Sequence, residues 1–420
     1  MSVGNSNSHR QRRVVITGMG VITPVGHDLD TLWSNLLAGR GGVGPVTRFD
    51  ASGFPSRIAA EVRDFEPEEH MDRKSARHLS RSCQFALAAS RRALAHAGFD
   101  PAEHDPDHIG VIVATAASGL EEIERGHTAM IERGPRRMSP FTAPMMITNM
   151  ASGVVAMHTR AGGPNYALVS ACSSSTHALG EAAEIIRRGG ARAMLAGGTE
   201  ATVTALAFGA FCQIKAISTR NDDPAHACRP FDAGRDGFVM GEGAAMLVLE
   251  DAEFARARGA SPLAELAGYG ATNDMYHFVA PHPEGDGAAR AMRLALRQAG
   301  RTPDQVDYIN AHGTSTRVGD IAETKAIKAV FGDAATGVPI SSTKSVHAHM
   351  FGATGAVEAI ACVLALREGE VPPTINLEDA DPECDLDYVA NVSRPVRVST
   401  AMSNSSGFGG HNATLVLTAP

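Results

Sequence analysis

Short apolar segments alternate with longer amphipathic segments along most of this 420-residue chain, and this alternation restricts the fold more than any other feature. The short segments are rich in β-branched residues, which is typical of buried strands. The longer ones space their apolar residues as in a helix and end at glycines. In the first part of the chain we expect strands at 13–23, 108–115, 166–170, 193–196 and 244–249, and helices at 29–37, 78–97 and 173–188.

The same alternation starts afresh after about residue 260. The elements expected there are strands at 264–269, 306–310, 338–341 and 413–417, and helices at 288–299, 321–331 and 357–366. Two successive βα-rich parts of unequal length predict an internally duplicated α/β fold with largely buried sheets. Because no low-complexity linker separates the parts, we expect halves at 1–260 and 261–420 that meet at a repeat junction rather than at a flexible hinge.

Composition and charge exclude several classes of protein. Hydrophobic residues make up 44% of the chain and charged residues 20%, which is too apolar for a disordered protein. The net charge is −8, and the one obvious basic run, Arg10 with Arg12 and Arg13, lies in a polar leader, so no nucleic-acid-binding face is expected. The leader lacks the apolar core of a secretion signal, and no segment reaches the ~18 apolar residues that span a bilayer.

Cysteine usage predicts a reduced, cytosolic protein with one special thiol. The six cysteines are scattered, without a Cys-x-x-Cys pair or a zinc-site spacing: Cys83, Cys172, Cys212, Cys228, Cys362 and Cys384. Cys172 stands between a predicted strand and a predicted helix, where the helix N-terminus supplies free N–H groups and partial positive charge. We therefore predict that Cys172 is a nucleophile, and we interpret the other five as buried structural cysteines.

Histidines follow two predicted strands of the second half. His312 begins a loop of small hydroxyl residues, and ligands of α/β sheets collect at such strand ends. His347 and His349 follow Lys344 in the segment that leads to Glu358. Because the unperturbed pKa of histidine is about 6.5, these side chains suit acid/base work. A structural histidine is the common alternative, and a zinc site is disfavoured since no third ligand with suitable spacing is found.

A glycine-dense segment precedes the last predicted strand. Residues 404–412 read NSSGFGGHN, which we predict to be a loop whose backbone approaches a ligand and offers an N–H group to a developing negative charge. A phosphate-binding loop is the rival interpretation, but no Lys-Ser/Thr pair follows. A merely flexible loop is the remaining alternative.

One cysteine, strand-end histidines, a lysine and a late glycine-rich segment, in this order, form a specific set. Together they resemble the β-ketoacyl-[acyl-carrier-protein] synthase II family of condensing enzymes, including the ketosynthase subunits of type II polyketide synthases. The resemblance runs from about residue 13 to residue 417 and includes the segments 217–223, 229–232, 241–243 and 372–377. It implies a thiolase-like fold, layered α-β-α-β-α.

The resemblance also implies a reaction and the residues that perform it. Cys172 would accept an acyl group from an acyl carrier protein, and His312 and His349 would stabilise the charge formed when the malonyl extender loses carbon dioxide. Lys344 and Glu358 would organise the histidines. Further implied roles are an oxyanion hole from the backbone N–H groups of Cys172 and Ser406, a pantetheine contact from Thr314 and Thr316, and an acyl pocket lined by Ala117, Thr142, Ser406 and Phe408.

Small side chains in the implied acyl pocket are the main departure from the family pattern. Ser406 stands where fatty-acid members usually carry a phenylalanine, and Ala117 and Thr142 stand where larger apolar side chains are common. We therefore expect a roomier pocket, suited to longer or more functionalised chains. His347 and Ala348 replace a usually small pair, and His411 follows the glycine-rich segment; we expect them to tune the surroundings without changing the reaction.

The implied partners are an acyl carrier protein and a second subunit. No separate cofactor and no metal are expected, because the substrates arrive on the carrier's phosphopantetheine. The dimer would be a homodimer or a heterodimer with a chain-length-factor homologue, with no nucleic acid and no membrane involved. Four basic residues are candidates for carrier docking, although solvated surface explains them equally well: Arg73, Lys74, Arg136 and Arg137.

Three rival functions remain open at this point. A chain-length-factor-type partner subunit has the same fold but typically lacks the nucleophile, so Cys172 argues against it. A thiolase acting on coenzyme A substrates uses a second cysteine as base, where this chain offers His349. A cysteine hydrolase would need an orienting acid for its base and a route for water to the acyl-enzyme, and the sequence indicates neither.

Overall fold

The computed structural model describes residues 12–420, so Arg10 and most of the polar leader lie outside the described residues. The strands of the first half are β1 (Val14–Ile22), β2 (Gly44–Pro45), β3 (Ile58–Ala59), β4 (Ile109–Ala114), β5 (Asn165–Tyr166), β6 (Ala193–Glu200) and β7 (Gly243–Asp251). Its helices are α1 (Leu29–Leu37), α2 (Arg73–His78), α3 (Arg81–Ala97), α4 (Leu120–Arg133), α5 (Thr142–Met145), α6 (Met150–Thr159), α7 (Ser174–Arg187), α8 (Ala205–Gln213) and α9 (Ala252–Ala257).

The second half shows the same alternation of strands and helices. Its strands are β8 (Ala264–Asn273), β9 (Tyr308–Asn310), β10 (Ile340–Ser341), β11 (Glu370–Val371), β12 (Arg394–Pro395), β13 (Thr400–Gly407) and β14 (His411–Thr418). Its helices are α10 (Asp286–Ala299), α11 (Arg317–Phe331), α12 (Lys344–His347) and α13 (Thr354–Glu368).

Strand order confirms the internal duplication. The large sheet runs β10-β9-β13-β14-β8-β1-β7-β6-β4-β5, and the halves meet where β1 pairs with β8 at two positions, Val15 with Glu265 and Ile16 with Ala264. Counted within its half, each set of five strands has the order 3-2-4-5-1 with the same directions, since β1–β7–β6 and β8–β14–β13 pair antiparallel and the remaining pairs are parallel. The boundary near residue 260 stays a prediction.

Close packing of a helix on glycines repeats in both halves. A Cβ on Gly20 of β1 would lie 2.2 Å from the carbonyl oxygen of Ala89 in α3, and a Cβ on Gly270 of β8 would lie 2.1 Å from that of Ala291 in α10. Both distances are far inside van der Waals contact, so each strand needs glycine where its outer helix crosses. The equivalent positions show that the two halves share packing as well as topology.

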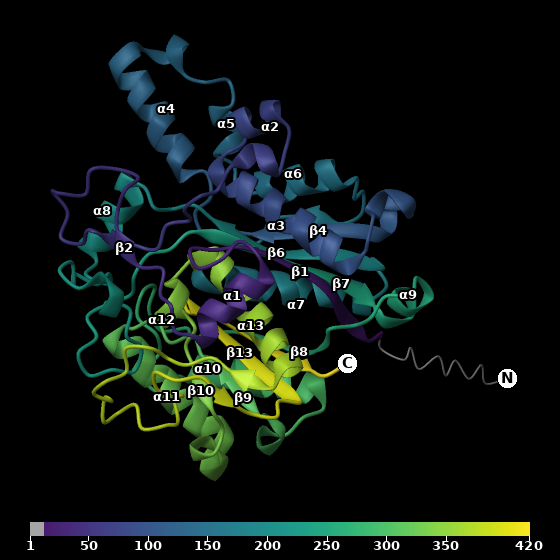
Figure 1. Cartoon of the computed structure of the whole chain (residues 1–420), viewed down its shortest axis with the longest axis vertical. Coiled ribbons are helices and arrows are strands. Elements are labelled where there is room, and N and C mark those ends of the chain that lie inside the picture. Colours follow the sequence, from purple (N-terminus) through teal and green to yellow (C-terminus); the bar gives the residue numbers. More distant parts are fainter. Residues whose placement is uncertain (1–11) are drawn as a thin grey trace.

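The helices form outer and central layers around the sheet, and the two kinds of layer differ in how much of each helix is buried. Helices α3 and α10 cover the outer faces, and α7 and α13 lie between the two halves of the sheet (Figure 1). Every residue of α13 from Thr354 to Ala365 is buried, as expected of a helix enclosed by sheets on both sides. The thiolase-like α-β-α-β-α layering implied by the resemblance is therefore confirmed.

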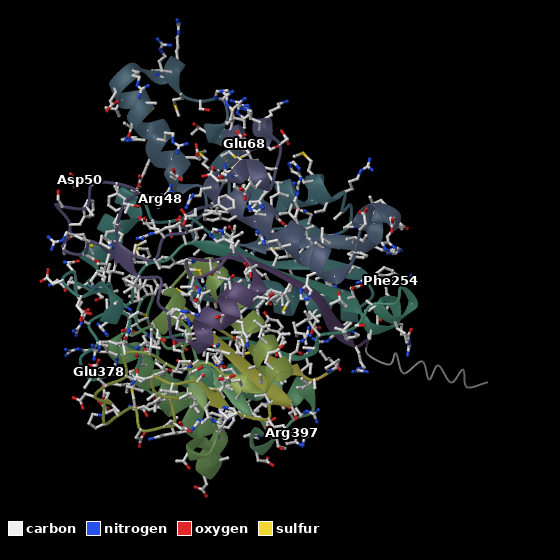
Figure 2. All side chains as sticks on the ribbon, in the orientation of Figure 1. Arg48, Asp50, Glu68, Phe254, Glu378 and Arg397 are labelled. Atoms are coloured by element: carbon white, nitrogen blue, oxygen red, sulfur yellow. The ribbon has the colours of Figure 1, made fainter. Side chains whose placement is uncertain are left out.

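The surface carries charges of both signs, and Figure 2 shows Glu68, Glu378 and Arg397 on the periphery of the molecule. Arg12 and Arg13 of the basic run pair with Asp251 and Glu265. No helix within residues 12–420 is long and apolar enough to cross a bilayer.

Two expected elements are wrong. The segment 166–170 is mostly not a strand, because β5 contains only Asn165 and Tyr166. Conversely, residues 404–407 belong to strand β13 rather than to a loop, and only Phe408–Gly410 form the turn to β14. The end of the strand escaped detection because its buried side chains at 403–405 are polar: Ser405 shares a hydrogen bond of 2.7 Å with Thr176, and Asn404 accepts one of 2.9 Å from Thr414.

Candidate active site

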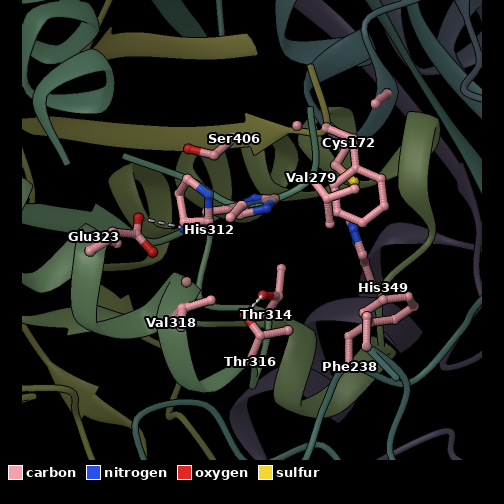
Figure 3. Close-up of a pocket in the computed structure, with 18 of the residues that line it drawn as sticks. Cys172, Phe238, Val279, His312, Thr314, Thr316, Val318, Glu323, His349 and Ser406 are labelled. Carbon is pink, nitrogen blue, oxygen red and sulfur yellow. Dashed lines mark hydrogen bonds between the residues drawn. The ribbon is translucent and has the colours of Figure 1, made fainter. Parts of the chain in front are cut away.

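A cavity of about 820 Å³ collects side chains from both halves of the fold. Figure 3 shows the sulfur of Cys172 and the rings of His312 and His349 facing the same space. Most of the predicted site residues line this cavity: Cys172, His312, His349, Thr314, Thr316, Ser406, Phe408 and Ala117. The fold therefore brings together residues that are up to 291 positions apart, from Ala117 to Phe408.

Cys172 sits in a tight turn that leads directly into α7. The preceding Ala171 has a φ of +52°, in the left-handed region that side chains rarely adopt, and Ser170 donates its N–H to the Ser174 hydroxyl at 2.8 Å. A single 3₁₀ turn, Ala171–Ser173, joins this bend to the helix. The geometry aims the thiol into the cavity at a helix N-terminus, where partial positive charge favours a thiolate.

Burial and nearby charge have opposite effects on the pKa of the Cys172 thiol. Burial raises its pKa to about 12, whereas the charge of Lys344 and hydrogen bonding from the N–H groups of Phe408 and of Cys172 itself lower the pKa. The side chain is only 9% exposed, so burial is the largest effect. The resting group is therefore a thiol, and the two N–H groups that stabilise negative charge at the sulfur are already in place.

The turn after β13 is positioned by a close approach to the cysteine. A Cβ on Gly407 would lie 2.7 Å from the carbonyl oxygen of Ser170 and 3.1 Å from the nitrogen of Cys172. Sequence reasoning assigned the oxyanion-hole N–H to Ser406, which stays a prediction; the N–H that the structure brings to the sulfur is that of Phe408. The Ser406 hydroxyl instead donates to Asn412 at 2.7 Å.

The two imidazoles are mutually perpendicular, with ring centroids 5.7 Å apart and an interplanar angle of 86°. Nδ1 of His349 lies 3.2 Å from the Thr354 hydroxyl, while Nε2 of His349 and Nδ1 of His312 have no hydrogen-bond partner among the described residues. Burial and the nearby Lys344 charge hold the pKa of both rings well below the usual value for histidine. Both rings are therefore neutral and have free nitrogens for a substrate.

Lys344 contacts the loop of His312 from outside the cavity. Its ammonium group is fully buried, pairs with the Glu358 carboxylate and donates to the carbonyl oxygen of His312. Neither Lys344 nor Glu358 lines the cavity. Lys344 therefore positions His312 through its backbone and places its positive charge near both rings.

Thr314 and Thr316 lie on the wall opposite the cysteine, near the N-terminus of α11 (Figure 3). Their hydroxyls are 3.0 Å apart, and Val318 lies beside them. Exposed Lys215 and Arg317 also line this cavity. The exposed part of the lining thus offers hydroxyl groups, two cationic side chains and the carboxylate of Asp236 to a polar, extended substrate arm.

Thr142 is the one predicted pocket residue that does not line this cavity. It lies in α5, 6% exposed, and its methyl group would be 2.7 Å from a Cβ on Gly126 of α4. Thr142 therefore packs two helices of the first half against each other. Its expected role at an acyl tunnel stays a prediction.

Two buried carboxylates that accept backbone N–H groups around the cavity, Glu323 and Glu200, were not predicted from the sequence. Glu323 of α11 accepts the N–H groups of His312 and Gly313, both at 2.7 Å, and so fixes the loop that carries the first histidine. Glu200, at the end of β6, accepts the N–H groups of Ala116 at 2.7 Å and Gly352 at 3.1 Å. Burial raises the pKa of Glu200 to about 7.

The signal for both glutamates was weak. A charged residue at a strand end or on a helix is usually a solvated one, and neither carries a recognisable motif. Glu323 stands among apolar residues on the buried face of a predicted helix, and that was the one available hint.

A duplicated α/β fold that presents one cysteine at a helix N-terminus to two neutral imidazoles is that of a thiolase-fold condensing enzyme. Family comparison agrees: the β-ketoacyl synthase N-terminal domain matches residues 11–255 and the C-terminal domain matches residues 263–378. The chain belongs to the β-ketoacyl synthase family, and it is an acyltransferase.

Individual relatives span nearly the whole chain. It is 50% identical over 405 residues to a 3-oxoacyl-[acyl-carrier-protein] synthase 2 of Synechocystis sp., which covers 96% of this chain and 97% of that protein. Two solved structures superpose with a TM-score of 0.91 over 98% of this chain and all of theirs. One is the ishigamide ketosynthase/chain length factor, at 37% identity, and the other, at 35%, is a ketosynthase bound to a hexaketide in complex with a type II polyketide synthase acyl-carrier protein.

Proposed function

We propose that the chain extends an acyl group by two carbons through a decarboxylative Claisen condensation on Cys172. The observation that carries this proposal is the convergence of one thiol and two neutral imidazoles, each with an unpaired ring nitrogen, on a single cavity. Such a set accepts an acyl group and stabilises an enolate without a separate cofactor.

The first half-reaction loads the enzyme. The sulfur of Cys172 attacks the carbonyl carbon of an acyl thioester on the carrier protein; the carrier's thiolate leaves and takes up the proton of the cysteine thiol. The N–H groups of Cys172 and Phe408 support this step because they stabilise negative charge on the sulfur and so favour the attacking thiolate. The products are an acyl-cysteine and a free carrier thiol.

The second half-reaction forms the carbon–carbon bond. The malonyl thioester loses carbon dioxide, and the electron pair of the broken bond forms an enolate whose oxygen accepts hydrogen bonds from His312 and His349. The enolate carbon then attacks the acyl-cysteine carbonyl, and the sulfur leaves and takes a proton from solvent. For His349, this requires a proton on Nε2, which fits a Thr354 hydroxyl that donates to Nδ1.

Acyl carrier protein is the proposed donor of both substrates. The hydroxyls of Thr314 and Thr316, together with Lys215 and Arg317 at the open end, suit the phosphopantetheine arm that such a carrier presents. The solved ketosynthase in complex with its acyl-carrier protein supports the same class of partner. Because the substrates are activated on that arm, the reaction needs no further cofactor or metal.

The small side chains Ser406 and Ala117 support an acyl pocket that takes long or functionalised chains, in a fatty-acid or a polyketide pathway. The rival role of a partner subunit without elongation activity is disfavoured by Cys172, His312 and His349 sharing one cavity. A thiolase-like exchange on coenzyme A is disfavoured too. It would need a second cysteine as base, and among the described residues no cysteine other than Cys172 lines this cavity.

We also propose a dimer that works in the cytosol. β5 is an edge strand, and apolar side chains near it are exposed: Tyr166 by 41%, Val169 by 51% and Met157 by 69%. An exposed apolar sheet edge favours pairing with a second chain. That chain is a second copy or a chain-length-factor homologue. The cytosolic location is supported by the six cysteines, all free and buried.

Intact-protein mass spectrometry tests the assignment. Wild type and Cys172→Ala are each incubated with acyl carrier thioesters of different chain lengths and then with malonyl carrier protein. We expect wild type to gain one acyl group and lose it again as a carrier-bound 3-oxoacyl product, and Cys172→Ala to gain none. Acyl loading that persists in Cys172→Ala would remove this cysteine from its role. Acceptance of short saturated chains alone would contradict the roomy pocket.

A further inference from the structure

The peptide that precedes His349 has an unusual backbone conformation. Ala348 has φ +60° and ψ −170°, in a region that is essentially restricted to glycine. Its methyl group is fully buried among Ile58, Val239 and other small apolar side chains. An alanine in this conformation persists only if the surrounding contacts hold it there.

Backbone hydrogen bonds hold three of the four polar groups around this peptide. The N–H of Ala348 donates to Lys344 at 2.8 Å, that of His349 donates to Val239 at 2.9 Å, and the His349 carbonyl accepts from Gly241 at 2.8 Å. Among the described residues, the Ala348 carbonyl receives no backbone N–H. Its partner is the side chain of the preceding residue, since Nδ1 of His347 lies 2.7 Å from the oxygen.

The His347 ring belongs to a chain of hydrogen bonds with one consistent direction. The Asn310 amide donates to the Thr343 hydroxyl at 3.3 Å, and that hydroxyl lies 3.0 Å from Nε2 of His347. Because the Ala348 carbonyl can only accept, Nδ1 must carry the proton, which leaves Nε2 to accept from Thr343. Burial and the Lys344 charge lower the pKa of His347 to about 3, so this single neutral tautomer persists at physiological pH.

We propose that His347 is a positioning residue for His349: it locks the strained Ala348 peptide through the carbonyl oxygen and thereby aims the His349 ring at the acyl-cysteine. This inference rests on the proposed role of His349 in decarboxylation. The His347 ring is fully buried and does not line the cavity, so it acts only through the Ala348 backbone.

Two conservative variants separate this role from simple packing. The side-chain amide of His347→Asn can present its N–H where Nδ1 lies, and so keeps the donor to Ala348. The longer His347→Gln reaches the position of Nε2, and so keeps the Thr343 contact but loses that donor. Ala348→Gly removes the need for a lock, because glycine adopts this backbone conformation without strain. Each His347 variant is therefore made alone and together with Ala348→Gly.

The experiment measures the two half-reactions separately. Acylation of Cys172 by acyl carrier thioester is followed by intact mass, and carbon dioxide release from malonyl carrier protein is followed with pre-acylated enzyme. In His347→Gln we expect decarboxylation to slow on the order of tenfold to a hundredfold, as for a catalytic group displaced by about 1 Å, with acylation within about twofold of wild type. His347→Asn should stay within about threefold, and adding Ala348→Gly to His347→Gln should restore most of the lost rate.

Unfolding by urea supplies a readout that does not depend on activity. If His347 locks Ala348, the loss of stability in His347→Gln is smaller when Ala348→Gly is also present, so the two effects are not additive. Equal rates for the Asn and Gln variants, a parallel loss of acylation and decarboxylation, or additive effects of the two substitutions would overturn the inference. A wild-type enzyme that loads acyl groups but releases no carbon dioxide would instead overturn the proposed function, and the urea measurement would still decide the inference.

Discussion

Among single residues, the two histidines of the proposed site have lowered pKa values, and this predicts the pH dependence of the reaction. Because the pKa values of His312 and His349 lie well below 6.5, both rings stay neutral from pH 6 to pH 8. Decarboxylation by the acylated enzyme should therefore vary by less than about twofold across this range, whereas a ring with the ordinary pKa of about 6.5 would be mostly protonated at pH 6. The rate is measured as carbon dioxide release, with thermal unfolding at each pH as the control for structural integrity.

A rate that falls with a midpoint near pH 6.5 would contradict this prediction.

The same low pKa values mean that acidic pH destabilises the folded chain. The unfolded chain takes up protons on these two histidines below about pH 6.5 and the folded chain does not, so their contribution to the free energy of unfolding decreases as the pH falls.

At the scale of elements, each half depends on a helix that crosses a strand at glycine. Gly20→Ala and Gly270→Ala place a methyl group 2.2 Å and 2.1 Å from a helix carbonyl oxygen, so strand and helix must separate. We expect each substitution to lower the free energy of unfolding by about 1–3 kcal/mol, as overpacking does. Urea unfolding measures the effect, and Gly53→Ala is the matched control, since nothing lies within 4 Å of its added methyl group.

The comparison between the two glycines also tests the duplication. Equivalent packing predicts losses of similar size in the two halves. A loss at Gly20 with none at Gly270 would mean that α10 adjusts where α3 does not.

At the scale of the whole molecule, the edge strand β5 is the proposed subunit contact. A carboxylate on this apolar surface would be desolvated by a partner chain, so Tyr166→Asp or Val169→Asp should convert dimer to monomer in analytical ultracentrifugation. Val392→Asp is the control, because Val392 is 72% exposed and far from β5 in the chain. A wild-type monomer, or equal behaviour of all three variants, would argue against this contact.

Local patterns predicted much of the fold, because a strand or helix that buries one apolar face shows its period in the sequence. The helix at 29–37 appears with those bounds, and the helix after Cys172 was readable from its apolar spacing, although the strand expected before the cysteine is mostly absent. The second half of strand β13 was not readable, since its buried residues 403–405 are polar and the side chains of Asn404 and Ser405 find partners only in Thr414 and Thr176.

Residue patterns alone were enough to predict the α/β class, the duplication and the three residues that we propose carry the chemistry. The tertiary structure alone decided which groups support them: the Phe408 N–H at the sulfur, Glu200 and Glu323 on backbone amides, and the His347 contact that holds Ala348. The reason is physical. Apolar periodicity is a property of neighbours in the chain, whereas the hydrogen bonds and strained peptides of a buried site are satisfied by partners that only folding brings within reach.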